Sequence, residues 1–274
     1  MHDIQNAYSA PRPDKQRSIF TQLLRGYRFS VCEDAASVAR ALEVRRQVYR
    51  DTCGYDVPIP DEYDGRSWLL LAEDVRTGEA VGSMRVTPRA AGPLEAEEYF
   101  ELPPALRSAR VVEITRFAVL PNHRDSRRFL PVVALGLFKL VSHFVVAAAG
   151  AEHAIVCSKA ERIWSYEWMR FKRSGLVARY TKLGGAEHEL MASDLRSGVG
   201  MHSDHRYWAF FFEIDHPEVV LPARLPQPGL RRQATFEPLP LKRSARGWNP
   251  VSSTWSRSSA WCMPEPAVPA RFST

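Results

Sequence analysis

Cysteine is scarce in this sequence, and the few cysteines show no pattern that predicts a metal site or a disulfide framework. Four cysteines occur among 274 residues, they lie far apart, and no two are spaced as C-x-x-C. Zinc sites and small disulfide-stabilised folds need such clusters. The first twenty residues also lack an apolar segment of the kind found in secretory signals. We therefore expect free thiols, no bound metal and a cytoplasmic protein.

Long uninterrupted apolar segments are absent as well. The most hydrophobic segment, residues 130–151, has the length of a membrane span, but Lys139, Ser142 and His143 fall near its middle. A central lysine costs about 3 kcal/mol on insertion into a bilayer. We therefore predict a buried helix of a globular domain here, and no transmembrane segment.

Acidic residues are nearly missing from the last part of the chain, so the charge is uneven. The whole sequence has a formal net charge of +6, and residues 223–274 contain eight arginines and lysines but only two glutamates. The same part holds Trp248, Trp255 and Trp261 and many prolines. This composition is typical of an extended tail. We predict a basic C-terminal extension over 222–274, which either stays solvated or contacts nucleic acid or an anionic membrane.

The remainder of the chain alternates between strand and helix patterns. After a polar leader over 1–26, it predicts one domain over 27–221. The expected helices are 35–49, which Asp34 caps, 130–149 and 159–174. The expected strands are 27–31, 67–75, 80–88, 111–121, 153–158, 176–183 and 206–214. This order predicts an α/β (α+β) fold in which helices cover a mixed sheet.

The expected strand at 111–121, VVEITRFAVLP, carries two charges although both of its faces should be buried. Glutamate and arginine are almost never fully buried unless they are paired. Side chains alternate along a strand, so Glu113 and Arg116 should point to opposite faces. If both serve one pocket, the strand must bulge between them. A bulge would also free backbone N–H groups that can donate to a developing oxyanion.

Further charges occupy positions at which the pattern predicts apolar residues. Arg45 lies on the apolar face of the helix at 35–49, and Arg85 lies among small and apolar residues of the strand at 80–88. An arginine in such a place either extends to solvent or meets an inward-facing carboxylate. The candidate partners are Asp61, Asp64 and Glu113. These charges together indicate a functional site or a buried ion network.

A set of residues along the chain forms an ordered motif. The set comprises Arg45, Tyr49, Asp61, Asp64, Arg85, Phe100, and Glu113 with Arg116 in VEITRFAV. In order and spacing it resembles the motif of the acyl-homoserine-lactone (autoinducer) synthases and the related N-acyl amino acid synthases, both of the GNAT acyltransferase superfamily. The resemblance covers roughly residues 27–215. It implies a GNAT-like, mostly antiparallel central sheet flanked by helices, and acyl transfer from a thioester to a primary amine.

The segment before the expected helix at 130–149 departs from the GNAT enzymes that use coenzyme A. These enzymes normally have a glycine-containing loop whose N–H groups bind the pyrophosphate, whereas this chain has PNHRDSRR, without glycine. The departure favours the phosphopantetheine thioester of acyl-carrier protein over acyl-CoA as the donor, and no tightly bound cofactor is expected. Arg124, Arg127 and Arg128 are the candidates to meet the phosphate and the acidic surface of the carrier.

The resemblance and the chemistry together define candidate roles, each with a structural alternative. Glu113 is the candidate base that takes the amine proton, directly or through a water; alternatively, it is only the partner of an arginine. Arg116 either holds the carboxylate of the acceptor or neutralises Glu113. Asp61 and Asp64 either bind the ammonium group of the acceptor or cap a turn of their loop.

The other residues of the motif are expected to shape the substrate site. Arg45 and Arg85 build its architecture, and Tyr49 and Phe100 are candidates for substrate contact. Phe100, Trp68 and the apolar helix either line an acyl tunnel or belong to an ordinary core.

We therefore expect an enzyme that transfers a fatty acyl chain from acyl-carrier protein to the amine of an amino acid or related metabolite. Tyr49 and Tyr55 stand where the homoserine-lactone synthases usually have Phe and Trp, which favours the N-acyl amino acid branch. The alternatives are a quorum-sensing-related autoinducer synthase that uses S-adenosylmethionine, and a CoA-dependent N-acetyltransferase. A non-enzymatic alternative is a nucleic-acid- or membrane-binding module whose basic tail carries the function.

Overall fold

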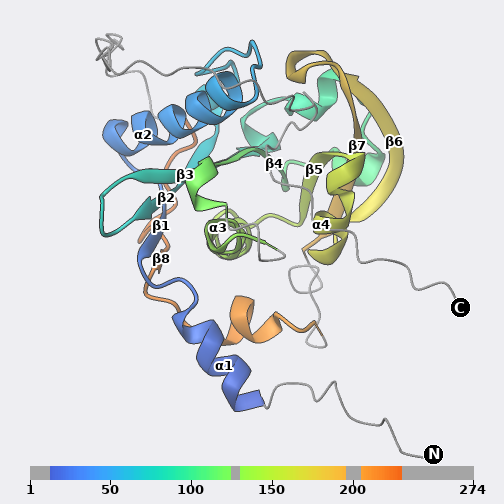
Figure 1. Ribbon diagram of the computed structural model, residues 1–274. Helices are drawn as coiled ribbons and strands as arrows, with labels where there is room; N and C mark the ends of the chain where they lie inside the picture. Colours follow the sequence, from blue (N-terminus) through green and yellow to red (C-terminus); the bar gives the residue numbers. More distant parts are fainter. Residues whose placement is uncertain (1–12, 125–129, 196–204, 230–274) are drawn as a thin grey trace, which may run out of the picture.

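The computed structural model describes residues 13–124, 130–195 and 205–229, and its strands form one mixed sheet (Figure 1). Across the sheet, the strand order is β6-β7-β5-β4-β3-β2-β1-β8. The strands are β1 Tyr27–Val31, β2 Trp68–Asp74, β3 Ala80–Pro88, β4 Val111–Val119, β5 His153–Lys159, β6 Lys172–Tyr180, β7 Ala186–Asp194 and β8 Val219–Val220. Neighbouring strands are antiparallel except β4–β5 and β1–β8, which are parallel. The predicted mixed, mostly antiparallel sheet is confirmed.

Helices cover both faces of this sheet. The α-helices are α1 Pro13–Gln22, α2 Ala35–Arg46, α3 Val132–His143 and α4 Ile163–Trp168, and the π-helical segments are η1 Gln47–Thr52, η7 Phe144–Ala148 and η10 Ala209–Glu213. In Figure 1, α2 lies above the sheet and α3 lies below it. Asp34 caps α2 as predicted, because its Oδ1 accepts a hydrogen bond of 2.7 Å from the N–H of Ser37.

Short 3₁₀ turns connect several of these elements. They are η2 Asp64–Arg66, η3 Arg89–Ala91, η4 Glu95–Glu98, η5 Pro104–Leu106, η6 Pro121–His123, η8 Ala160–Arg162 and η9 Thr181–Leu183. Two of them, η2 and η4, carry or adjoin the charged residues of the site described below.

The largest core lies between the sheet and α3. It includes Phe29, Leu70 and Met84 from the sheet and Leu137 from the helix. Gly136 lets α3 approach β1 closely, since a Cβ at this position would lie 2.1 Å from the ring of Phe29. The predicted buried helix is therefore confirmed over α3. In the described part of the chain, no helix has both the length and the apolar character needed to span a bilayer.

The expected helix at 159–174 is much shorter than its pattern indicates. It consists of the turn η8 and the single helix α4, and the backbone then takes a left-handed φ of 65° at Arg170. Strand β6 begins at Lys172 and pairs with β7. Pairing at the sheet edge thus prevails over the helical pattern.

Two further expectations for the C-terminal half are wrong. The polar stretch after β6, where no strand was expected, contains β7, which pairs with both β5 and β6. The aromatic run at 206–214, expected as a strand, forms η10, whose Phe210 and Phe211 are buried. The ammonium of Lys139 donates hydrogen bonds of 2.6 Å to the carbonyls of Phe210 and Ile214 and so holds η10 on α3. A continuous apolar run does not by itself distinguish a strand from a helix.

Residues on both sides of the predicted domain also contact the core. Phe20 and Leu24, within the predicted leader, are buried. At the start of the predicted extension, the carbonyl of Pro226 accepts a hydrogen bond of 2.7 Å from the indole of Trp68. The rest of the extension, 230–274, lies outside the described residues.

Among the described cysteines, one departs from the expectation of free thiols. Cys32 and Cys157 are free, whereas Cys53 is disulfide-bonded, and Cys262 lies outside the described residues. Sequence spacing gives no measure of which distant cysteines meet in space. Among the residues that the structure describes, no group of His, Cys, Asp and Glu is arranged to hold a metal ion.

Candidate active site

Strand β4 contains the bulge that is required if its two charges serve one pocket. The pairing of β4 with β3 shifts between Ser83 and Arg85, so that Arg116 and Phe117 together face one residue of β3. Arg116 takes a left-handed backbone φ of 53° at this point, a conformation that is costly for a residue with a Cβ. The bulge brings the side chain of Arg116 to the same face as Glu113. The predicted bulge is confirmed.

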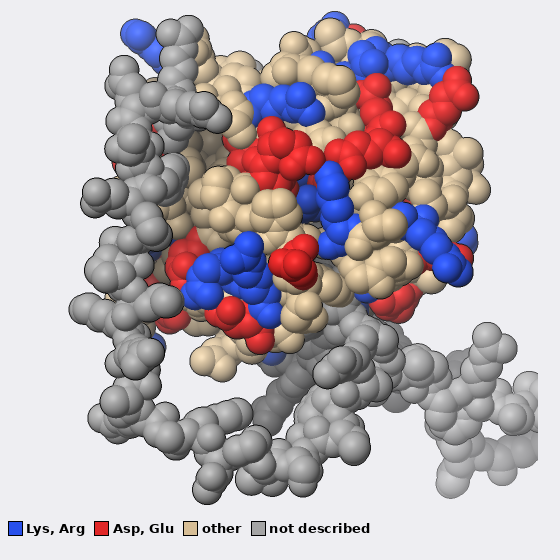
Figure 2. Space-filling view, turned by 90° about the horizontal axis from the view of Figure 1, so that it is seen from above, with Lys and Arg blue, Asp and Glu red and all other residues tan. Residues whose placement is uncertain are grey.

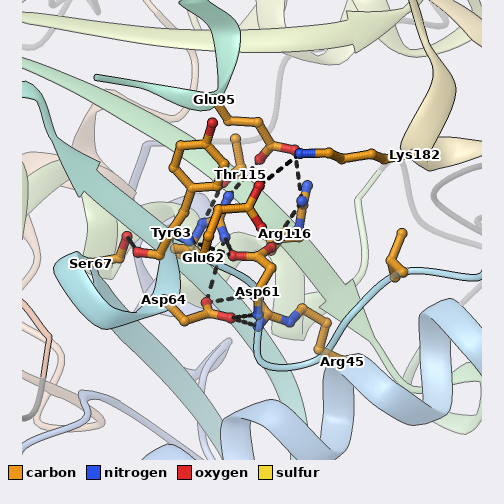
Figure 3. Close-up of polar contacts among 12 residues, drawn as sticks. Arg45, Asp61, Glu62, Tyr63, Asp64, Ser67, Glu95, Thr115, Arg116 and Lys182 are labelled. Carbon is orange, nitrogen blue, oxygen red and sulfur yellow. Dashed lines mark hydrogen bonds and ion pairs between the residues drawn. The ribbon is translucent and has the colours of Figure 1, made fainter. Parts of the chain in front are cut away.

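Four charged side chains beside the bulge form a closed ring of ion pairs (Figure 3). Arg85 places Nη1 2.5 Å from Asp61 Oδ1 and Nη2 2.5 Å from Glu95 Oε2. Arg116 places Nη2 2.7 Å from Glu95 Oε1 and 3.0 Å from Asp61 Oδ2. No side chain of the ring is more than 5% exposed. Each buried charge thus meets two opposite charges, as its burial requires.

Arg45 and Asp64 extend this ring toward α2. Arg45 donates to Asp64 from both guanidinium ends, with 2.9 Å between Nη1 and Oδ1. The two aspartates also fix their own loop, because Asp61 N–H donates to Asp64 Oδ2 over 2.7 Å and Tyr63 N–H donates to Asp61 Oδ1 over 3.0 Å. Asp61 and Asp64 therefore cap the turn and pair with arginines at the same time.

The network formed by the ring with Arg45 and Asp64 holds three guanidinium groups and three carboxylates. Burial by itself raises the pKa of Asp61, but the three arginines outweigh it and hold this pKa at about 2. Burial likewise disfavours the charge on Arg116, and Glu95 and Asp61 more than compensate, so that the pKa of Arg116 is raised. Asp61 and Arg116 therefore stay ionised at neutral pH, and the formal charges of the network balance internally.

Glu113 adjoins the network without pairing with its arginines. Its carboxylate accepts hydrogen bonds from the backbone N–H groups of Glu95, over 2.8 Å, and Ala96, over 3.0 Å. Burial, and then the charge of Glu95, raise the pKa of Glu113 to about 8, against the effects of Arg85 and Arg116. A carboxyl group that titrates near neutral pH is suited to proton transfer.

Strands β4 and β5 separate immediately beyond Glu113. Their parallel pairing covers only Val111–Glu113 against His153–Ile155. Next along the two strands, Ile114 and Val156 line a small cavity of about 30 Å³ together with residues of α3, among them Phe138. Residues of the apolar helix thus line this cavity, whereas Phe100 and Trp68 do not.

Two arginines lie beyond the ends of these diverging strands: Arg124 follows β4, and Arg162 ends η8, the turn that follows β5. Arg124, just after β4, donates from Nε to the carbonyl of Val119 over 2.7 Å, and its Nη2 is buried without a hydrogen-bond partner in the described part of the structure. Burial, and then the like charge of Arg162, lower the pKa of Arg124 to about 10. An anion between the two guanidinium groups would relieve both effects. Arg127 and Arg128 lie outside the described residues.

Tyr49 and Phe100 lie in the apolar core on the α2 side of the sheet. The hydroxyl of Tyr49 donates to the carbonyl of Phe117, at the bulge, over 3.5 Å. The ring of Phe100 lies 6.3 Å from that of Tyr180, between centroids. Both aromatic residues frame the site, and neither belongs to the network.

Glu95 is the member of the network that the sequence analysis missed. It lies in PLEAEEYF, where Glu97 and Glu98 are partly exposed, and this pattern does not separate a buried glutamate from its solvated neighbours. Glu95 is fully buried because its backbone N–H is held by Glu113 and its carboxylate by two arginines. The number of charges could have indicated it, because three buried arginines need three carboxylates as partners.

An outer layer of charges covers the network. The ammonium of Lys182 lies 2.8 Å from Glu62 Oε1 and 2.9 Å from Glu98 Oε2, and Tyr63 donates its hydroxyl hydrogen to Glu98. In Figure 2, acidic and basic side chains lie next to each other over the face seen from above. Within this outer layer, Lys182 thus pairs with two carboxylates.

Comparisons with known proteins identify the family and the fold of the chain. Residues 40–194, more than half of the chain, match the family described as N-acyl amino acid synthase FeeM. No curated protein matches the sequence. Among solved structures, FeeM, an N-acyl amino acid synthase from uncultured soil microbes, is 12% identical, and the match covers 62% of this chain and 90% of that chain with a TM-score of 0.50.

A second solved structure shares the fold at a similar level. BjaI, a CoA-dependent acyl-homoserine lactone synthase solved with SAM and isopentyl-CoA, is 19% identical, and the match covers 75% of this chain and 95% of that chain with a TM-score of 0.54. These likenesses identify the fold as the GNAT-like mixed sheet, and the family match covers the elements that carry the network. The chain therefore belongs to the N-acyl amino acid synthase FeeM family and is an N-acyltransferase.

Proposed function

We propose that this acyltransferase moves a fatty acyl chain from the phosphopantetheine thioester of acyl-carrier protein to the α-amine of an amino acid or related metabolite. One observation carries the proposal. Glu113, a carboxyl group with a pKa raised to about 8, lies where β4 and β5 diverge. A proton acceptor beside an opening between two strands is what direct attack of an amine on a bound thioester needs.

The diverging strands offer the donor a place. Beyond Glu113, the edge of β4 toward β5 has no strand partner in the described structure, so its backbone groups can hydrogen-bond the amides of a pantetheine arm. The phosphate would then lie between Arg124 and Arg162. The acyl chain would enter the apolar cavity beside Ile114, whose volume of about 30 Å³ requires the walls to move apart.

In the proposed reaction, a neutral amine attacks the thioester carbonyl. The N–C bond forms, the C–S bond breaks, and Glu113 takes the proton of the amine, directly or through a water, before the leaving thiolate takes it up. Backbone N–H groups at the bulge stabilise the oxyanion. Because Arg116 is already paired with Asp61 and Glu95, its proposed role is to hold this bulge in shape. Arg85 does the same from β3.

The test is to incubate the purified chain with carrier proteins loaded with medium and long acyl groups and a pool of amino acids and amines. Mass spectrometry then looks for an amide. We expect Glu113→Gln to lower the rate by at least about 100-fold, and the exposed-site control Glu33→Gln to leave it unchanged. An absence of amide with every donor, or equal rates for Glu113→Gln and wild type, would contradict the proposal.

The same assay separates the enzymatic alternatives. If the chain is an autoinducer synthase, added S-adenosylmethionine gives an acyl-homoserine lactone. If it is an N-acyl amino acid synthase, the amino acids give amides that keep a free carboxylate. Acyl-CoA replaces the carrier thioester only if coenzyme A is the donor. With a carrier-protein donor, KM should rise with salt, because paired surface charges are screened.

The non-enzymatic alternative is tested by truncation. The cut should follow Gly229, because this residue donates its N–H to the carbonyl of Ser67 over 2.9 Å and Pro226 binds Trp68. We expect the truncated chain to keep its acyl-transfer rate. If the truncated chain instead loses only its binding to nucleic acid or anionic vesicles, that binding belongs to the tail. A cytoplasmic location, where acyl-carrier protein is available, completes the proposal and is tested by cell fractionation.

A further inference from the structure

The proposed acceptor brings a carboxylate into the site, and the network has no charge left for it. Its three guanidinium groups already face three carboxylates. A second anion beside Arg116 would compete with Asp61 and Glu95, both of which are buried. The acceptor carboxylate therefore needs a different cation.

Lys159 is a buried cation outside the network. It is the last residue of β5, and it is 6% exposed. Its ammonium donates a long hydrogen bond of 3.4 Å to the hydroxyl of Tyr55 and lies 5.8 Å from the centre of that ring. No carboxylate of the described residues forms an ion pair with it. A buried ammonium group is stable only when an anion or several acceptors surround it, and burial lowers the pKa of Lys159 by more than the charge of Glu161 raises it.

The position of Lys159 links it to the opening between the strands. Along β5 it shares a face with Cys157 and with Ile155, which is the residue opposite Glu113 on β4. The ring of Tyr55 lies 6.0 Å from that of Tyr49, whose hydroxyl reaches the bulge. Lys159 and the two tyrosines thus form a continuous group from the outer end of β5 to the bulge.

We propose that Lys159 binds the carboxylate of the amino-acid acceptor and that Tyr55 orients the ammonium group of Lys159 by a hydrogen bond and a ring contact. This inference rests on the proposed function, and it names the group that separates amino acids from simple amines as substrates. The acceptor's amine then lies at the level of Cys157, between Lys159 and Glu113, and faces the thioester.

The test compares amino acids with the amines that lack their carboxylate. The pairs are L-phenylalanine with 2-phenylethylamine and L-leucine with 3-methylbutylamine, and binding to the full chain is measured by calorimetry. Wild type should bind the amino acid of a pair about tenfold to hundredfold more tightly than the amine, the effect of one charge-assisted hydrogen bond. Lys159→Met should remove this difference, Lys159→Arg should restore part of it, and the exposed-site control Lys172→Met should keep it.

Each outcome decides the inference. Wild type that binds amino acids no better than amines, including binding of neither, overturns it. Equal weakening of both members by Lys159→Met, or a rise only in the KM for the acyl donor, also overturns it, because the lysine would then serve the fold or the donor. If the preference for amino acids depends on Lys159 but no amide forms, the inference is supported and the proposed acyl transfer is contradicted.

Discussion

The role of Glu113 leads to a quantitative prediction about pH. With a pKa of about 8, about one tenth of this carboxyl group is ionised at pH 7. If the ionised form is the base, kcat/KM rises about tenfold per pH unit below pH 8 and levels off above it. The measurement is amide formation at fixed ionic strength between pH 6 and pH 9.5.

The same group makes folding stability depend on pH in the opposite direction. In the folded chain the pKa of Glu113 lies at about 8, above its ordinary value of 4.5, so the folded state binds the proton more tightly than the unfolded state. The resulting stabilisation is complete below pH 4.5 and is lost as pH rises through 8, and it is on the order of 5 kcal/mol. Urea unfolding at pH 6 and pH 9 should show the part of this loss that falls between the two pH values, about 3 kcal/mol, in wild type and not in Glu113→Gln.

Two controls decide whether the rate inflection belongs to the enzyme. The acceptor amine also loses a proton in this range, so the profile is repeated with amines of lower and higher pKa, and the inflection near pH 8 should remain in every series. A rate that is flat between pH 6 and pH 8, or an inflection that follows the pKa of the amine alone, refutes the assignment of Glu113 as the base.

Three further predictions concern the network, the core and the cavity. Asp61→Asn should lower the free energy of unfolding at pH 7 by about 3–5 kcal/mol, because it leaves two buried arginines short of a partner. Urea titration should show this difference shrinking as pH falls through 3.8 toward 2, where wild-type Asp61 itself becomes protonated; a constant difference would speak against the pairing. Gly136→Ala should cost about 1–3 kcal/mol through contact with the Phe29 ring, whereas Gly65→Ala, whose Cβ meets nothing within 4 Å, should cost less in the same measurement. Ala154→Leu should fill the cavity that Ala154 lines and shift the amide products toward shorter acyl chains, and an unchanged chain-length distribution would place the acyl group elsewhere.

Much of the sheet could be predicted because its strands and turns are specified locally. The short apolar segments that form β1, β2 and β3 and the Asp34 cap all depend on neighbours a few residues away. The bulge could be predicted as a condition, because period-two geometry forbids Glu113 and Arg116 from sharing a face without it. The motif likewise marked six charged residues that the structure places together.

The C-terminal half could not be predicted as well, because its elements depend on partners distant in the chain. The aromatic run at 206–214 has no decisive period, and it becomes helical because Lys139 of α3 binds its carbonyls. The strand β7 looks polar in isolation, and it is a strand because β5 and β6 supply its hydrogen bonds.

The sequence by itself determined that charges would be buried beside β4, since their positions interrupt apolar patterns. Only the tertiary structure decided which charges pair. Glu95 reaches Arg85 and Arg116 from a separate turn, while Glu113, the most conspicuous carboxylate in the sequence, is left with backbone N–H groups and a raised pKa. The physical reason is that burial fixes the need for a counter-charge locally, whereas the counter-charge can come from any segment that the fold brings within hydrogen-bond distance.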